Sequence, residues 1–476
     1  MRPMAKRVLL LPLLALVLFA AAGCAGSGGG SGGGGGSSAD AASLVPADAL
    51  AYATIDTDLG SDELKSAQQV LGKFPIESTA LARVMSAAAK QGVDLRKLSS
   101  SVGPVLDVAL LKTGAGAGAV GFARPSDEQA FDAQLGKLVH TTVSGWTVFA
   151  KTQALLDAVT SKTAALADDA TYKEALASLP GTGDAIARAY APASSLKSLG
   201  GSSPASTIQP FAGAARWFTG ALTSKDGTSF KLEAHVKTSA GGSSSGGTGL
   251  ADEIPSGAIA ALSLTGGSFT LPAAAQAQLG TLTQSAGVDV QGLLGLLRGP
   301  VIAYVKPGAP IPAVTLAAKP PDPAGAEQAI TSLLAKALAS QTNGAAPQTT
   351  TVDGVQLQTL SLGPVALYWG RVGDQIAVTD DTTSISAIKS GAASGKLADD
   401  SLFKDAVKGS GMPDSNQGFL YVDAKDALPL VEGFATLASQ TIPPQLQSNL
   451  APLASALVYG ARSGDVEDFV VYVSTN

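Results

Sequence analysis

An eleven-residue stretch occurs twice in this chain of 476 residues. The first copy reads LADDATYKEAL at 166–176 and the second reads LADDSLFKDAV at 397–407, with six identical positions. Five further pairs of similar segments follow the same order along the chain. They are 45–51 with 254–260, 91–95 with 286–290, 103–106 with 299–302, 123–130 with 319–329, and 187–190 with 418–421. Matches that keep their order indicate an internal duplication.

The duplication predicts two domains. The first repeat spans 43–238, the second spans 252–476, and a Gly/Ser-rich linker at 239–251 joins them. A chain of this length exceeds what one hydrophobic core ordinarily holds. In each repeat, strand-like segments alternate with helix-like segments and the strands are separated by short loops, which favours antiparallel pairing. The predicted fold class is therefore α+β, a tandem duplication in which each copy is a mostly antiparallel sheet packed with helices.

The N-terminal residues 1–23 have the pattern of a bacterial signal peptide. A basic segment is followed by an uncharged apolar run at 8–22, which is shorter than the roughly 20 residues of a membrane-spanning helix. The basic residues are Arg2, Lys6 and Arg7. We therefore exclude residues 1–23 from the predicted fold.

Small residues precede Cys24 and resemble the lipobox of lipoprotein signal peptides, with Ala21 in place of the usual leucine. The alternative is ordinary cleavage within 20–22, which releases a soluble protein with a free thiol. Cys24 is the only cysteine and cannot form an internal disulfide. We predict that Cys24 is lipidated, because two or three acyl chains on one residue anchor a protein stably to a membrane.

The segment at 24–42 is predicted to be the lipidated cysteine and a flexible linker, since 25–38 is almost only Gly and Ser. The predicted location is extracytoplasmic, with the protein anchored to the bacterial cell membrane by lipid. Once the signal peptide is removed, 29 basic residues remain against 38 acidic ones, a formal net charge of −9. An acidic chain without a basic block is not expected to bind nucleic acid.

The doubled stretch contains the most conspicuous acids, Asp169 and Asp400, each at the start of a helical pattern. Adjacent aspartates can be catalytic or can bind a metal. However, a carboxylate at this position also accepts backbone N–H groups and faces the positive end of the helix dipole. Because nothing else that could act as a ligand lies nearby in the sequence, we interpret both residues as N-caps and predict no metal site here.

Other patterns resemble catalytic motifs without their context. The sequence at 116–121 fits G-x-G-x-x-G, but a strand rather than a helix is expected to follow it, and 306–312 in the second repeat is Pro-rich. A G-x-S-x-G match at 242–246 lies in the linker. The S-x-x-K matches at 194–197 and 386–389 lack the remaining elements of a penicillin-binding site. We predict no catalytic residues and no cofactor.

Histidine is scarce, since His140 and His235 are the only two. Without a second cysteine, a zinc site is not expected. The acids Asp56 and Asp58 can supply oxygen ligands, but their spacing does not fit a calcium-binding EF-hand loop. We interpret them as part of a solvated loop that leads into a helix.

The segment 44–56, the Gly-Pro strand start at 103–104 and the Leu-Ala-Asp-Asp helix starts resemble a bacterial lipoprotein family known as domain of unknown function 3352 (DUF3352). The resemblance implies an anchored envelope protein and supplies no catalytic residues. Two functions remain as expectations. One is non-enzymatic binding of an apolar envelope ligand such as a lipid, and the alternative is a scaffold that binds envelope proteins. An enzyme is the least expected class.

Overall fold

The structure of the chain is a computed structural model. It describes residues 41–75, 101–179 except 115, 185–198, 215–239, 248–266, 295, 298–338 except 309–310, 346–437 except 364 and 394, and 442–476. Cys24, the signal peptide expected at 1–23 and most of the linker expected at 24–42 lie outside these residues.

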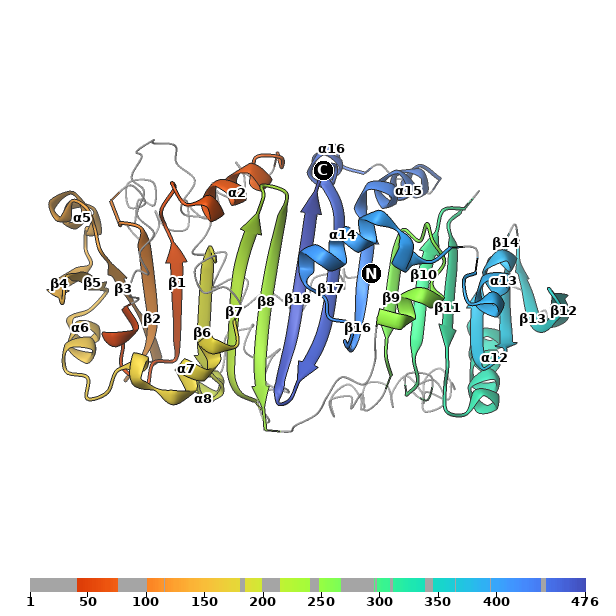
Figure 1. Cartoon of the computed structure of the whole chain (residues 1–476), viewed down its shortest axis with the longest axis horizontal. Coiled ribbons are helices and arrows are strands. Elements are labelled where there is room, and N and C mark those ends of the chain that lie inside the picture. Colours follow the sequence, from red (N-terminus) through yellow and green to blue (C-terminus); the bar gives the residue numbers. More distant parts are fainter. Residues whose placement is uncertain are drawn as a thin grey trace. The chain divides into compact units, whose positions relative to one another are not determined.

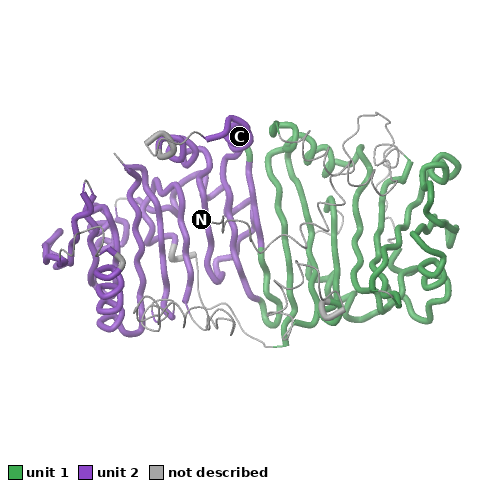
Figure 2. Tube along the Cα trace, turned by 180° about the vertical axis from the view of Figure 1, so that it is seen from behind, with its two compact units in different colours: residues 1–242, 463–469, 475 green, residues 243–462, 470–474, 476 purple. Residues whose placement is uncertain are grey.

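Contacts divide the chain into two compact units, which Figure 2 shows in different colours. Unit 1 comprises residues up to 242 together with 463–469 and 475, and unit 2 comprises 243–462, 470–474 and 476. The first division falls inside the segment 239–251 that the sequence marks as a linker. The last strand, β18, contributes residues to both units.

Unit 1 contains an antiparallel sheet in the order β4-β5-β3-β2-β1-β6-β7-β8 (Figure 1). Its strands are β1 (Ala51–Asp56), β2 (Val105–Thr113), β3 (Gly116–Ala123), β4 (Val139–Val143), β5 (Trp146–Ala150), β6 (Ala187–Pro192), β7 (Ala215–Lys225) and β8 (Ser229–Thr238). Its helices are η1 (Ala41–Ser43), α2 (Asp62–Leu71), α5 (Glu128–Leu135), α6 (Gln153–Thr160), η2 (Leu166–Asp168), α7 (Ala170–Ala177) and α8 (Ala193–Ser198).

Unit 2 contains an antiparallel sheet in the order β12-β13-β14-β15-β11-β10-β9-β16-β17. Its strands are β9 (Ala260–Leu264), β10 (Val301–Lys306), β11 (Ala313–Ala318), β12 (Gln348–Val352), β13 (Val355–Leu362), β14 (Val365–Val372), β15 (Gln375–Thr379), β16 (Gly418–Asp423) and β17 (Leu453–Ser463), and β18 is Val466–Thr475. Its helices are η3 (Thr248–Glu253), α12 (Pro323–Leu338), α13 (Thr382–Ser390), η4 (Leu397–Asp399), α14 (Ser401–Ser410), α15 (Ala424–Leu437) and α16 (Pro444–Leu450).

The protein is thus α+β with extensive antiparallel sheet, as the sequence predicts. Short hairpins explain this arrangement locally. The loop between β4 and β5 has only Ser144 and Gly145 between the paired residues Val143 and Trp146, and both loop residues have positive φ. Such two-residue turns match the twist of antiparallel strands.

The strands of the two units share a pattern of neighbours and register. In unit 1, β1 lies between β2 and β6, and Ala53 pairs with Ala189. In unit 2, β9 lies between β10 and β16, and Leu262 pairs with Leu420. The strand that opens each unit therefore has the same place in its sheet.

Two isolated bridges repeat in the same way. One joins Pro46 to Ala165 in unit 1, and the other joins Pro255 to Lys396 in unit 2. Each bridge fastens the chain just before the first strand to the residue that precedes the Leu-Ala-Asp-Asp sequence.

The main core of each unit lies on the face of the sheet that α7 or α14 covers, and smaller buried clusters lie on the opposite face. All three tryptophans are buried, as their apolar sequence context predicts. In unit 1, Tyr172 of α7 packs against strand residues that include Tyr52, Tyr190 and Trp217. In unit 2, Phe403 of α14 occupies the matching place. Burying aromatic rings supplies a large share of core stability.

The sequence also predicts helices at 61–74 and at 126–138, the second opened by a serine cap, and both predictions need correction. The helix expected from Ser61 does begin there, but it ends at Leu71, which is 40% exposed instead of facing the core. Helix α5 begins after Asp127, whose carboxylate accepts the N–H of Ala130, and not after Ser126. Aspartate reaches the first-turn amides from that position, so the cap lies one residue later than predicted.

Candidate functional site

The repeated aspartates lie at helix starts, but only one of them caps its helix. The carboxylate of Asp169 accepts the N–H of Tyr172 at 2.8 Å, which confirms the predicted cap of α7. Asp400 has nearly the same backbone angles before α14, yet its side chain makes no cap bond. Its Oδ2 instead accepts the N–H of Gly257 at 2.9 Å. The second aspartate therefore fastens a preceding turn.

The G-x-G-x-x-G sequence lies in β3, in the β2–β3 hairpin, so no helix follows it. Its last glycine has a packing role. A Cβ at Gly121 would lie 2.3 Å from the Phe149 ring of the neighbouring strand β5. The two S-x-x-K matches fall on α8 and α13, and 242–246 lies outside the described residues.

Both histidines lie on strands of unit 1, and each has an acidic neighbour. His140 Nε2 on β4 is 3.5 Å from Asp132 Oδ1. His235 Nδ1 on β8 is 2.5 Å from Asp468 Oδ1, and this histidine is buried. In the described residues no group of three or more His, Cys, Asp or Glu side chains is arranged to hold a metal ion.

Asp56 is the last residue of β1, and the loop that follows it leads into α2, as the sequence predicts. One carboxylate oxygen of Asp56 accepts the N–H of Asp58, and the other accepts the hydroxyl of Ser61, the N-cap of α2. Burial raises the pKa of Asp56, and these hydrogen bonds oppose that rise. The acids shape the turn before the helix.

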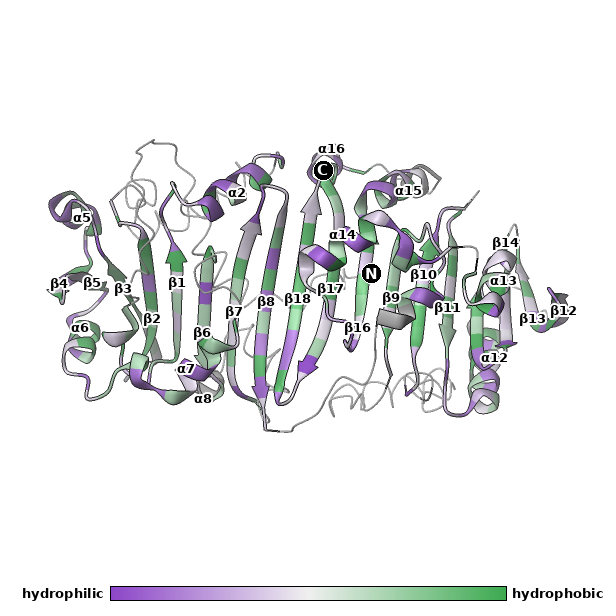
Figure 3. Cartoon of the chain, in the orientation of Figure 1, coloured by the Kyte–Doolittle hydropathy of each residue, from purple (hydrophilic) through white to green (hydrophobic). Residues whose placement is uncertain are grey.

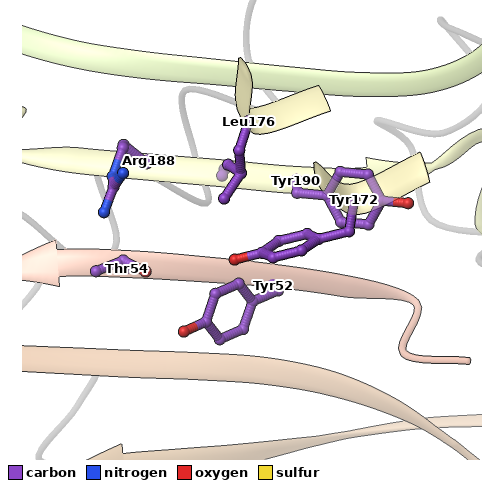
Figure 4. A pocket seen from close by; sticks show the side chains of 7 residues that line it. Tyr52, Thr54, Tyr172, Leu176, Arg188 and Tyr190 are labelled. Atoms are coloured by element: carbon purple, nitrogen blue, oxygen red, sulfur yellow. The ribbon is translucent and has the colours of Figure 1, made fainter. Parts of the chain in front are cut away.

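A small pocket lies between α7 and the sheet in unit 1 (Figure 4). Tyr52 and Thr54 of β1 and Arg188 and Tyr190 of β6 form its floor, because Tyr52 pairs with Tyr190 and Thr54 with Arg188. Tyr172 of α7 covers them. Its ring lies 5.9 Å from that of Tyr52 and 5.2 Å from that of Tyr190, both edge to face.

This pocket is too small for a lipid. Its volume is about 10 Å³, which is space for about one water molecule. Burial, followed by the charge of Asp169, raises the pKa of Tyr190. The tyrosine stays a neutral phenol at ordinary pH. Sequence reasoning missed Arg188, because an arginine in a strand ordinarily indicates a solvent-facing position.

Two larger open grooves lie in unit 2. One, of about 520 Å³, is lined by residues around the start of α12, including Arg298 and Asp322. The other, of about 480 Å³, lies beside the start of α13 and includes Lys306, Tyr368 and Asp380. Both linings mix charged and apolar groups, so neither groove resembles a site for an acyl chain.

An extended apolar surface lies on the other face of the unit 2 sheet, away from Phe403. Two rows of apolar side chains cross β11, β10, β9, β16 and β17 in register, and we call these ten residues the apolar band. The first row is Leu316, Ala303, Leu262, Leu420 and Val458, and the second is Val314, Val305, Ala260, Val422 and Ala456. At about 4.8 Å between strands, each row is roughly 19 Å long.

The apolar band is only partly covered. Leu420 is 45% exposed and Val314 is 53% exposed, and the other eight residues are half-buried. Leu264, diagonal to Leu420 across the strand pair, is 38% exposed. Helix α12 packs beside the band, since its Ile330 belongs to a cluster against which Leu316 rests. Contiguous exposed apolar surface of this kind marks interaction sites.

The hydropathy of the strands accounts for the apolar band. In Figure 3, β10 and β11 are mostly green (hydrophobic), whereas β8 alternates green and purple (hydrophilic). A strand that is apolar on both faces reads as a continuous hydrophobic run. In unit 1 the smaller, buried Ala53 and Ala189 occupy the places of Leu262 and Leu420. At these two places the larger leucines occur in unit 2, and Leu420 is 45% exposed.

Within the described ranges, the helices are too short or too polar to cross a membrane.

Comparison with known proteins adds little. No family model matches the chain, and no curated protein sequence matches it. Among solved structures, crystal form IV of TP0453 has a TM-score of 0.24 and 10% identity, with 42% of this chain and 81% of that chain covered. Crystal form I of TP0453 has a TM-score of 0.23 and 10% identity, with 42% and 79% covered. At such TM-scores the likeness carries no argument about this protein.

Proposed function

We propose that this protein is a membrane-anchored extracytoplasmic lipoprotein that binds an apolar envelope ligand, such as the acyl chain of a lipid. The observation that carries the ligand proposal is the apolar band, with Leu420 and Val314 about half exposed. Each row, roughly 19 Å long, is comparable with the hydrocarbon thickness of one leaflet, which is roughly 15 Å. An acyl chain lying across the strands would contact one row from end to end.

The anchor is Cys24, and the chain between it and the folded body sets the reach of the protein. Ala41, the first described residue, is buried, and its N–H donates to Asp107 Oδ2 at 2.7 Å. Sixteen residues, 25–40, lie between Cys24 and Ala41, and a Gly/Ser-rich chain of that length has an r.m.s. span of roughly 20–24 Å. The body would therefore work within a few tens of ångströms of the lipid surface.

We also propose that the two units arose by tandem duplication. The ordered sequence matches support this, as do the equivalent neighbours of β1 and β9 and the paired bridges Pro46–Ala165 and Pro255–Lys396. A duplicated unit frees one copy to change. On this account the sheet face that carries the apolar band acquired Leu262 and Leu420, where unit 1 has alanines.

The proposal assigns no reaction to the protein. The acids in the doubled stretch bind backbone amides, and the glycine-rich sequence packs in a hairpin. The proposed partners are thus the membrane, through the anchor, and a lipid-like ligand.

Organic extraction of protein purified from its own membrane, followed by mass spectrometry, tests this function. We expect a co-purified apolar molecule in a fixed ratio to the protein. If extraction releases no such molecule and the same envelope proteins co-purify repeatedly, the ligand-binding function is wrong and the scaffold alternative is supported.

A further inference from the structure

We propose that the pocket beside Arg188 in unit 1 binds a monatomic anion of the size of chloride. This site is independent of the apolar band, which lies in unit 2. Four observations support it: the unpaired guanidinium, the engagement of the nearest carboxylates, the size of the pocket, and the difference from unit 2.

The side chain of Arg188 is half-buried under α7. Within the ranges that the structure describes, it forms no hydrogen bond and no ion pair. Withdrawing a charge from water without a partner is costly, so buried charges are ordinarily paired. An anion in the adjoining pocket would supply the missing partner.

Carboxylates lie in the same row of the sheet, but other groups engage them. Thr54 is opposite Arg188 on one side and Ala221 on the other, and the next strands carry Asp107 and Glu233. Glu233 forms an ion pair with Lys231, and Asp107 accepts the Ala41 N–H at 2.7 Å. The arginine charge therefore has no contact partner in its own row.

The size of the pocket selects the ligand. A volume of about 10 Å³ holds one water-sized group, so a phosphate or carboxylate does not fit within it. Figure 4 shows Arg188 with Thr54 at one end and the three tyrosines at the other. The edges of aromatic rings carry positive partial charge, which favours a neighbouring anion.

The fold does not require an arginine at the position of Arg188. In unit 2, the register places Ser263 opposite Phe419, where unit 1 has Thr54 opposite Arg188. Phe419 is buried and its ring lies 5.3 Å from that of Phe403. The same place in the fold is thus filled by an apolar ring in one unit and by a guanidinium beside a water-sized pocket in the other.

The test is thermal unfolding of the whole protein in sodium chloride and in sodium gluconate at equal ionic strength, since gluconate is too large for the pocket. Arg188→Gln removes the proposed site. Arg216→Gln, at an exposed arginine of β7, is the control for the same change in net charge. Arg188→Phe is a second variant, because unit 2 shows that phenylalanine fits this place.

We expect chloride to raise the melting temperature of the wild type and of Arg216→Gln relative to gluconate. Both Arg188 variants should lose this difference, with at least a tenfold weaker apparent affinity for chloride. A crystal soaked in bromide should show a bromide beside the guanidinium. Equal melting temperatures in the two salts, a chloride effect that persists in both Arg188 variants, or a pocket that holds only water would overturn the proposal.

Discussion

Leu262 and Leu420 lie directly opposite each other on the antiparallel strands β9 and β16, on the face of the unit 2 sheet that is turned away from Phe403. On the other face of the same strands, Ala261 and Tyr421 form part of the core. The sheet is therefore apolar on both faces at its centre. The main core explains the face towards Phe403, and α12 covers the other face only beside Leu316. The rest of the apolar band is the feature on which the proposed ligand binding depends.

The anchor gives the first prediction. Cys24→Ala should move the protein from the membrane fraction to the soluble fraction, because no acyl chain can be attached. Ser27→Ala, three residues further on, should leave the distribution unchanged. Immunoblotting of separated fractions measures both. A Cys24→Ala protein that remains with the membrane would contradict lipid anchoring.

The repeated aspartates give a second prediction. Asp169→Ala should lower the free energy of unfolding by about 1 kcal/mol and speed hydrogen exchange of the Tyr172 amide, because a cap bond is lost. Asp400→Ala should instead speed exchange of the Gly257 amide and leave the first turn of α14 unchanged. The two variants are controls for each other. Faster exchange in α14 would show that Asp400 caps its helix after all.

A third prediction concerns Tyr52 and Arg188 of unit 1, whose places in unit 2 are taken by Ala261 and Phe419. Tyr52→Ala alone should destabilise unit 1 by about 3–5 kcal/mol, because a large buried ring is removed. Adding Arg188→Phe reproduces the Ala261 and Phe419 arrangement of unit 2 and should recover part of that loss. Urea unfolding of the two single variants and the double variant measures the coupling, which we expect to be about 1–3 kcal/mol. If the losses in unfolding free energy of the two single variants simply add in the double variant, these positions are not equivalent in the two units.

Asp381 gives a prediction about pH. Burial acts to raise the pKa of this carboxyl, but hydrogen bonds from Thr383 and Ser384 and the charge of Lys306 outweigh it, so the pKa lies below its usual value. A lowered folded-state pKa contributes stability that is complete above the unfolded-state value of about 3.9. That stability is lost as the pH falls through the folded-state pKa.

The difference in unfolding free energy between the wild type and Asp381→Ala should therefore be constant near neutral pH and shrink below about pH 4. Asp374→Ala, at an aspartate whose side chain is 78% exposed, is the control for the loss of one negative charge. Chemical unfolding across this pH range supplies the numbers. A difference that widens in acid would contradict the argument.

The sequence predicts the antiparallel α+β architecture because the relevant signals are local. Strand-like runs separated by short turns favour hairpins. Asp169, three residues before Tyr172, is a strong signal for a helix N-cap. The repeat also identifies equivalent positions, such as Tyr190 and Tyr421, before their strands are seen. These features depend on residues that are near each other in the chain.

The candidate sites could not be predicted in this way, because they depend on register between distant segments. Nothing in the sequence around Arg188 indicates that Thr54 lies opposite it. The apolar band left a clearer signal, since 301–305 reads Val-Ile-Ala-Tyr-Val and a continuous apolar run indicates a strand with two apolar faces. That Leu420 extends the same row becomes apparent only once β16 is paired with β9.

The most direct test of the central claim is a fluorescence titration with a long-chain acyl probe. Leu420→Glu places a charge in the apolar band, and Leu446→Glu makes the same change on α16, where the leucine is 49% exposed compared with 45% for Leu420. The account predicts saturable binding that Leu420→Glu weakens at least tenfold and Leu446→Glu leaves unchanged. Equal affinities for the wild type and both variants would contradict it.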